Sequence, residues 1–151
     1  MRIGQVAALA GVPTATVRYY ERRGLIAQTT RTASGYRFFG HDAARRLRKD
    51  GYRTAVVTNN VREFSHGWRG LVPVEELFDV AVDSSDCGLR KPNPAVFHHT
   101  LELLGGVAPN RAVFLDDSPG NVDGARRAGL HAIHVEDPDA ALAALDALLQ
   151  R

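Results

Sequence analysis

The sequence predicts an α/β protein in which an amino-terminal winged helix-turn-helix precedes a parallel sheet with flanking helices. Short helical patterns fill the start of the chain, whereas apolar runs that end in polar residues alternate with helical stretches after residue 53. Charge changes sign at the same place. Residues 1–53 hold eleven Lys/Arg and three Asp/Glu, and residues 54–151 hold eight Lys/Arg and fourteen Asp/Glu. A concentrated positive charge favours nucleic acid as a partner, although a solvated surface explains it equally well.

Composition narrows the class of protein. A chain of 151 residues with 44% hydrophobic and 7% aromatic residues suits one globular domain or two small ones. It contains neither an apolar run of about eighteen residues nor a signal-like amino terminus, so we expect no membrane partner. A lone cysteine, Cys87, excludes an internal disulfide framework and predicts a cytoplasmic location.

Two short helices joined by a glycine-containing turn are predicted at the amino terminus. Apolar residues between 3 and 10 follow helical spacing, and Gly11 is placed to end that helix. Pro13 and Thr14 open a second helix that ends near Gly24, since proline is tolerated in a first helical turn. This arrangement is typical of a helix-turn-helix.

The second helix carries a cationic stripe. Thr14, Arg18 and Arg22 share one face because they are four residues apart. Such a face fits the major groove of double-stranded DNA, and Arg18 suits either a guanine or a phosphate. An exposed charged helix is the alternative.

A hairpin, or wing, is predicted over residues 28–39. Ser34-Gly35 is a turn signal, and the β-branched and aromatic residues on either side suit two short strands. Arg31 and Arg37 would then be available to phosphates. A third helix is expected to begin at His41-Asp42 and to run over residues 43–49.

The first 48 residues resemble the MerR family of transcription regulators. The resemblance rests on MRIGQVA at residues 1–7, GV at 11–12, TVRYYERRGLI at 16–26 and GYR at 35–37. It implies a MerR-type winged helix-turn-helix domain over residues 1–48 that binds promoter DNA as a homodimer. It also implies recognition-helix contacts by Arg18 and Tyr20, and wing contacts by Tyr36 and Arg37. The family's long dimerisation helix has no counterpart, since no sustained heptads follow Lys49, so dimerisation stays open.

The rest of the chain predicts a parallel sheet. Short apolar runs indicate buried strands at residues 54–58, 80–82, 112–115 and 132–135, and helices are expected at 94–104, 122–128 and 139–149. Strands that alternate with helices form a parallel sheet, and ligand-binding groups collect at the carboxyl ends of its strands.

Polar side chains at those strand ends suit phosphate chemistry. Thr58 and Asn59 offer a hydroxyl and an amide to anionic oxygens, and the ammonium of Lys91 would neutralise a phosphoryl group. Asp116 and Asp117 are hard oxygen ligands suited to Mg2+. Each has an ordinary structural alternative, such as a helix cap or a surface lysine, but together they favour a phosphorylated small molecule as ligand.

Residues 46–151 resemble the haloacid dehalogenase (HAD) superfamily, specifically its phosphatase-like members. The matching segments are VVTNN at residues 56–60, residues 88–97, and FLDDSPGNVDGARRAG at 114–129. The resemblance implies an incomplete Rossmann-like sheet over residues 49–151. It places Thr58 in the second motif of that superfamily, Lys91 in the third, and Asp116 with Asp117 in the metal-binding fourth.

The first motif of the superfamily, a strand ending in Asp-x-Asp, has no counterpart here. Upstream of Thr58 the only acidic residues after the recognition helix are Asp42 and Asp50, both beside helical sequence, and Asp137-Pro138-Asp139 follows the last strand. The resemblance implies that this strand supplies the attacking carboxylate and lies between the Thr58 and Asp116 strands, and that a cap domain follows it. We therefore expect no intact catalytic set, and either a gap in the sheet or a new pairing of its neighbours.

Three hypotheses remain. The leading one is a DNA-binding transcriptional regulator joined to an inactive HAD-like domain that binds a phosphorylated effector or, weakly, Mg2+. The second is a Mg2+-dependent HAD-like phosphatase whose nucleophile comes from another chain or an unrecognised position. The third is a non-functional fusion remnant, favoured by the abrupt join near residues 45–49.

Overall fold

A computed structural model describes residues 13–15, 18–19, 36–59 and 73–150. Its elements are, in chain order, α3 (Tyr36–Lys49), β1 (Ala55–Thr58), α5 (Val74–Leu77), β2 (Val80–Asp83), α6 (Ser84–Cys87), α7 (Pro94–Leu103), the 3-10 helix η2 (Pro109–Arg111), β3 (Val113–Asp116), α8 (Pro119–Arg127), β4 (His131–His134) and α9 (Pro138–Leu149). The predicted strands and the three predicted helices of this part are confirmed. The short elements α5, α6 and η2 are not predicted, because three or four residues are too few to show a helical period. No helix in the described ranges is long and apolar enough to cross a membrane.

The amino-terminal prediction is partly tested. Thr14, Ala15, Arg18 and Tyr19 have helical backbone, in agreement with the second predicted helix, whereas the first helix and the Ser34-Gly35 turn lie outside the described residues. The second wing strand is wrong, because residues 36–39 form the first turn of α3. Aromatic content is a weak, context-dependent signal for a strand, and here a helix that packs on α5 and α9 extends back through this segment.

The sheet is divided into two parallel pairs. β1 pairs with β2 from Ala55↔Val80 to Thr58↔Asp83, and β3 pairs with β4 from Val113↔His131 to Asp116↔His134. Within the described residues, β1 and β3 are each hydrogen bonded to a single strand and not to each other. Of the two outcomes expected for a missing central strand, a new pairing of β1 with β3 does not occur in the described ranges.

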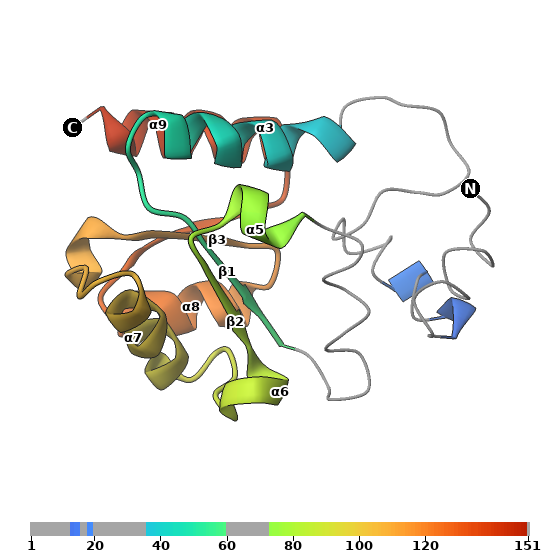
Figure 1. The fold of residues 1–151 in the computed structure, drawn as a ribbon, viewed down its shortest axis with the longest axis vertical. Coiled ribbons are helices and arrows are strands. Elements are labelled where there is room, and N and C mark those ends of the chain that lie inside the picture. Colours follow the sequence, from blue (N-terminus) through green and yellow to red (C-terminus); the bar gives the residue numbers. More distant parts are fainter. Residues whose placement is uncertain (1–12, 16–17, 20–35, 60–72, 151) are drawn as a thin grey trace.

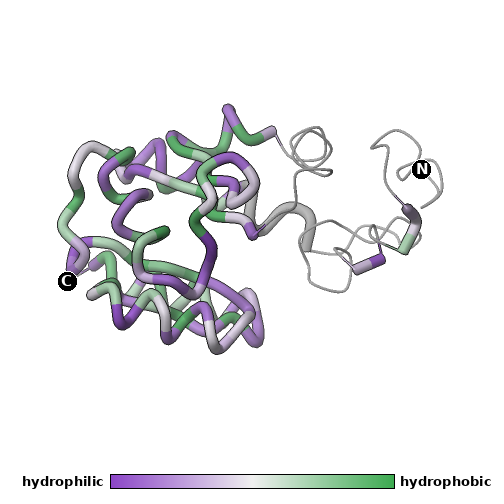
Figure 2. Tube along the Cα trace, turned by 90° about the horizontal axis from the view of Figure 1, so that it is seen from below, coloured by the Kyte–Doolittle hydropathy of each residue, from purple (hydrophilic) through white to green (hydrophobic). Residues whose placement is uncertain are grey.

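Helices cover both faces of the strands (Figure 1). α3 and α9 lie side by side on one face, and α7 and α8 cover the other. The buried core joins the two strand pairs: Val57 of β1 and Phe114 of β3 both pack against a cluster of Val82, Val96, Phe97, Ala125 and Ala128. The Phe97 and Phe114 rings meet edge to face at a centroid distance of 4.9 Å. Hydrophilic and hydrophobic residues alternate along the helices, as expected when one face of each helix is buried (Figure 2).

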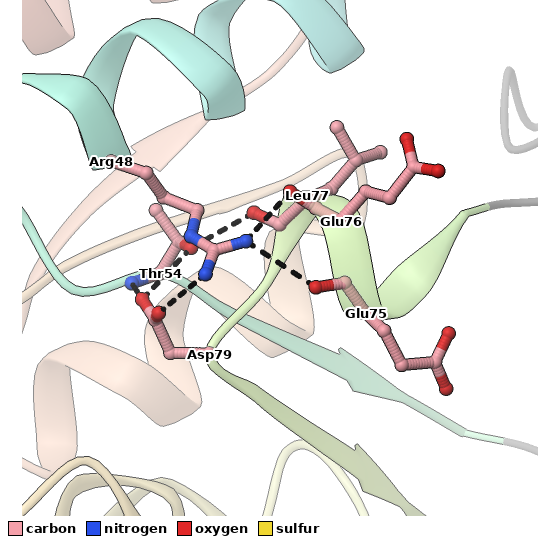
Figure 3. Close-up of polar contacts among 6 residues, drawn as sticks. All are labelled: Arg48, Thr54, Glu75, Glu76, Leu77 and Asp79. Carbon is pink, nitrogen blue, oxygen red and sulfur yellow. Dashed lines mark hydrogen bonds and ion pairs between the residues drawn. The ribbon is translucent and has the colours of Figure 1, made fainter.

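Helix α3 is attached to the α/β layers by a polar network (Figure 3). The Arg48 guanidinium donates to the Glu76 carbonyl at 2.6 Å and lies 3.1 Å from a carboxylate oxygen of Asp79. The Thr54 amide donates to the other Asp79 oxygen at 2.8 Å, and the Thr54 hydroxyl donates to the Leu77 carbonyl at 2.9 Å. The end of α3, the start of β1 and the end of α5 are therefore held together.

A second attachment joins α3 to α9. Arg46 bonds Asp146 with two nitrogens, at 2.6 and 3.2 Å, and Ala44 is buried against the rest of the protein. Gly51 ends the helix with a φ of +89°, a conformation that favours glycine. The chain then turns into β1, so the sequence that follows the predicted wing is structurally part of the α/β layers.

Candidate functional site

Lys91 lies in the loop between α6 and α7, where Asn59 fixes its backbone. The Lys91 amide donates to Asn59 Oδ1, and Asn59 Nδ2 donates to the Lys91 carbonyl, both at 2.9 Å. Asn59 follows the last residue of β1, so this pair of bonds holds the loop against the carboxyl end of the first strand. The Asn59 side-chain amide therefore positions the backbone of Lys91.

The Lys91 side chain extends to the carboxyl end of β3. Its Nζ lies 2.7 Å from Asp116 Oδ2, and the two side chains are only 11% and 8% exposed. The ammonium also lies 5.6 Å from the centroid of the Phe114 ring, within range of a cation–π attraction. An ammonium has three donors, so this contact leaves Lys91 able to donate to a further anionic oxygen.

Asp116 is held on its other oxygen as well. Oδ1 accepts from the Ser118 amide at 2.9 Å and from Asn121 Nδ2 at 3.0 Å. Burial alone would raise the pKa of Asp116, but the hydrogen bond and charge of Lys91, helped by Ser118 and Asn121, outweigh it and lower the pKa below its usual 3.8. Asp116 is therefore a carboxylate at neutral pH.

The fit of this site to Mg2+ is poor in the described part of the chain. Three N–H groups already occupy most of the roughly four lone-pair positions of Asp116. The neighbouring Asp117 is exposed, and its carbonyl lies 3.0 Å from Nε2 of His134. Across the described ranges, no three His, Cys, Asp or Glu side chains are grouped to bind a metal. The described residues alone thus do not form a closed magnesium site.

Thr58 and Asp83 complete the carboxyl end of the first strand pair. Thr58 is the last residue of β1 and lies opposite Asp83 in the β1–β2 register. Asp83 is 2% exposed, and its Oδ1 accepts from the Ser85 amide at 2.9 Å and from the Ser85 hydroxyl at 2.7 Å. Asp83 thereby caps α6 and adds a second buried acidic residue to this edge of the fold.

The structure brings one of the two predicted residue sets together. Lys91 contacts both Asn59, through its backbone, and Asp116, through its side chain, and Thr58 directly precedes Asn59 in the chain. Of the predicted DNA contacts, Thr14 and Arg18 lie on helical backbone, with Arg18 exposed. Tyr20 and Arg22 lie outside the described residues, and Tyr36 with Arg37 begins α3.

Three site residues are not predicted from the sequence. Asn121 and the Ser118 amide hold Asp116, and Asp83 borders Thr58. A signal exists for the first two: an asparagine five residues after a strand-terminal aspartate lies in the first turn of the next helix and points back to the strand end. Asp83 gives no such signal, since an aspartate before a short helix is ordinarily just a cap.

Comparison with known families divides the chain near residue 40. Residues 2–39 match the family described as MerR family regulatory protein. Residues 40–129 match the family described as haloacid dehalogenase-like hydrolase. The second match begins inside α3, in agreement with the packing of that helix on α5 and α9. MerR family domains bind DNA in transcription regulators, so DNA binding follows for residues 2–39.

Curated relatives match the second region. Acyl-CoA dehydrogenase family member 10 of Mus musculus is 39% identical over 107 residues, which are 71% of this chain and 10% of that protein. Bifunctional epoxide hydrolase 2 of Rattus norvegicus is 34% identical over 108 residues, 69% of this chain and 19% of that protein. Pyrophosphatase PpaX of Bacillus cereus is 30% identical over 110 residues, 64% of this chain and 50% of that protein. The chain thus spans between a tenth and a half of the length of these relatives.

Solved structures share the fold. A crystal structure of an uncharacterized protein from Corynebacterium glutamicum aligns with a TM-score of 0.69 at 23% identity, over 81% of this chain and 88% of that one. A HAD phosphatase from Thermococcus onnurineus aligns with a TM-score of 0.57 at 21% identity, over 89% of this chain and 74% of that one. The strand-end residues, the matched ranges and the shared fold agree, and the chain belongs to the haloacid dehalogenase-like hydrolase family, with a MerR family region ahead of it.

Proposed function

We propose that the chain is a DNA-binding transcription regulator whose α/β part binds a phosphate group and performs no covalent phosphoryl transfer by itself. The observation that carries this proposal is the contact between Lys91 and Asp116. It supplies an ammonium with spare donors at the strand ends, whereas the partner carboxylate is occupied by three N–H groups and is not free to attack phosphorus. Thr58 adds a hydroxyl at the same edge. A cytoplasmic location belongs to the same proposal.

The DNA-binding part of the proposal is supported by the MerR match and by the positive charge of residues 1–53. The matched residues 2–39 belong to the basic stretch, and Arg18 is exposed on helical backbone. We assign DNA contacts to Thr14, Arg18, Tyr20 and Arg22. We add Tyr36 and Arg37, which would act from the first turn of α3 and not from a wing strand. Two chains would bind a two-fold operator more tightly than one, so a homodimer belongs to this proposal.

A mobility shift on promoter DNA at several salt concentrations tests this half. Arg18→Ala should weaken binding by about tenfold, the usual loss for one good base or phosphate contact. Arg111→Ala removes another exposed arginine, from the acidic part of the chain, and should have no effect. Binding that is equally weak on promoter and random DNA would reduce the activity to nonspecific charge.

A Mg2+-dependent phosphatase is the second candidate, favoured by the ionised Asp116 beside Lys91 and by the similarity to pyrophosphatase PpaX. The attacking carboxylate would then come from outside the described residues or from another chain. Turnover of p-nitrophenyl phosphate with Mg2+, abolished by Asp117→Asn, would establish this candidate. If inorganic phosphate binds in equilibrium dialysis and no ester is turned over, the regulator is supported. If the chain has neither activity and low thermal stability, it is a fusion remnant.

A further inference from the structure

The backbone of Lys91 is held by a side chain from another element. Residues 88–93 lie between α6 and α7 and belong to no helix or strand, so no repeating pattern of backbone bonds fixes this loop. Within the loop, the Asn93 amide donates to the Arg90 carbonyl at 2.9 Å. The Lys91 amide donates instead to Asn59 Oδ1, and the Lys91 carbonyl accepts from Asn59 Nδ2, both at 2.9 Å.

One side chain thus bonds both backbone polar groups of Lys91. An asparagine side chain has one carbonyl oxygen and one NH2 group, so Asn59 bonds Lys91 as the opposite residue of an antiparallel strand does. Asn59 directly follows Thr58, the last residue of β1, and β1 is fixed by its register with β2. The position of the Lys91 backbone is therefore tied to the end of a paired strand.

A different contact holds the far end of the Lys91 side chain. Nζ lies 2.7 Å from Asp116 Oδ2 at the end of β3, and the Lys91 side chain is 11% exposed. A lysine has a flexible four-carbon stem, and fixing that stem costs conformational entropy. Because Asn59 and Asp116 hold its two ends before any ligand arrives, binding does not have to meet that cost again.

We propose that Asn59 is a positioning residue for phosphate binding, which holds the Lys91 backbone so that the ammonium, while paired with Asp116, offers its remaining donors to a phosphate group. This inference rests on the phosphate binding proposed above. It assigns Asn59 a role that needs no contact with the phosphate. Because the Asn59 NH2 group has a second N–H, direct contact with the anion is the competing role, and the experiment separates the two.

Asn59→Leu tests the positioning role on the full-length chain, because leucine has nearly the shape of asparagine and forms neither bond. Equilibrium dialysis with inorganic phosphate should give an affinity about tenfold lower than that of wild type, as expected when hydrogen bonds that orient a binding group are lost. Asn93→Ala is the matched control, since it removes from the same loop the bond between Asn93 Oδ1 and the Ala95 amide that caps α7. It should lower the midpoint of thermal unfolding and leave the phosphate affinity unchanged.

Reductive methylation of lysine distinguishes positioning from direct contact. Lys49 and Lys91 are the two lysines of the chain, and Lys49 is exposed, so mass spectrometry compares the site lysine with a reference in the same molecule. Without phosphate, the ratio of Lys91 to Lys49 methylation should rise several-fold in Asn59→Leu, because a loop released from β1 opens more often and exposes the amine. In Asn93→Ala the ratio should stay at its wild-type value.

The possible results separate this inference from the function on which it rests. A lower affinity with an unchanged methylation ratio would mean that Asn59 contacts the phosphate directly, and the positioning role would be wrong. An equal loss of affinity in Asn93→Ala would reduce the effect to general loosening of the loop. If wild type binds phosphate and Asn59→Leu binds it equally well, Asp116 and the packing of the loop on α8 place Lys91 without Asn59. If wild type binds no phosphate, the proposed function fails, and the methylation ratio alone decides whether Asn59 positions Lys91.

Discussion

At Asp116 two opposing effects act on one carboxyl group. Burial favours the neutral acid, whereas the ammonium of Lys91 and two further N–H donors favour the carboxylate and win. The same bonds that keep Asp116 ionised also occupy most of its lone pairs, which is why we propose phosphate binding by Lys91 and no attack by Asp116. The ammonium of Lys91 therefore balances the buried negative charge of Asp116 at the carboxyl end of β3.

Lys91→Met should lower the free energy of unfolding by about 3 kcal/mol at pH 7, because it leaves a buried carboxylate without its partner. The lowered pKa of Asp116 means that its contribution is present above 3.8 and is lost as the pH falls through the still lower folded value. The difference between wild type and variant should therefore shrink as the pH falls through that lowered pKa, below which the carboxyl group is neutral in both proteins.

Urea unfolding at several pH values measures this difference. Lys49→Met provides the matched control, since Lys49 is exposed and is the other lysine of the chain. A loss of the same size at pH 7 and at the lowest pH where the protein stays folded would mean that the lysine stem, and not its charge, stabilises the site.

The sequence predicts which residues gather at the strand ends better than it predicts what each of them contacts. Lys91 and Asp116 are found from their places near successive strand ends, and they do meet. Asn59 is predicted to bind an anion, and the sequence does not predict that its side chain also binds the Lys91 backbone. An amide can serve either partner, and the choice depends on how closely the Lys91 loop approaches β1, which no local pattern records.

At the scale of elements, α8 fits tightly against the loop that carries Lys91. A Cβ added to Gly124 would clash with the backbone carbonyl of Pro92, so the absence of a side chain there allows helix and loop to approach. Gly120, in the same helix, has open space around it. Neither glycine has a positive φ, so the two differ in packing alone.

Gly124→Ala should therefore destabilise the protein by about 1–3 kcal/mol, the usual cost of overpacking, despite the better helix propensity of alanine. Gly120→Ala should be neutral or stabilise by up to about 1 kcal/mol, because only propensity changes. Thermal unfolding of the two variants provides the comparison. Equal effects would mean that the Lys91 loop moves aside without cost.

The elements also show where local pattern fails. Strands β1 to β4 are predicted because apolar runs ending in polar residues are typical of parallel strands. The helical turn at residues 36–39 is missed because its aromatic residues suit a strand equally well, and only the packing of α3 on α5 and α9 decides between them. The sequence leaves open whether β1 and β3 pair with each other; among the described residues they do not, and both strands pack against the same helical core.

At the scale of the whole molecule, the two family regions meet inside a helix. The MerR match ends at residue 39, within α3, and the same helix bonds Asp146 through Arg46 and Asp79 through Arg48. Helix α3 is thus the structural start of the α/β part as well as the end of the head. The predicted domain boundary after residue 48 stays a prediction, and it would place α3 in a different domain from α5 and α9, which it contacts.

Two truncated chains test this boundary. A chain that begins at Tyr36 keeps α3 and should unfold cooperatively with the helix content expected for α3 to α9. A chain that begins at Asp50 loses the bonds of Arg46 and Arg48 and the burial of Ala44. We expect it to unfold at a lower urea concentration than the chain that begins at Tyr36, because it lacks the Arg48 hydrogen bond and the buried contact of Ala44. Circular dichroism during urea unfolding measures the stability of both chains. If the two chains are equally stable, α3 belongs to the DNA-binding head and not to the α/β part.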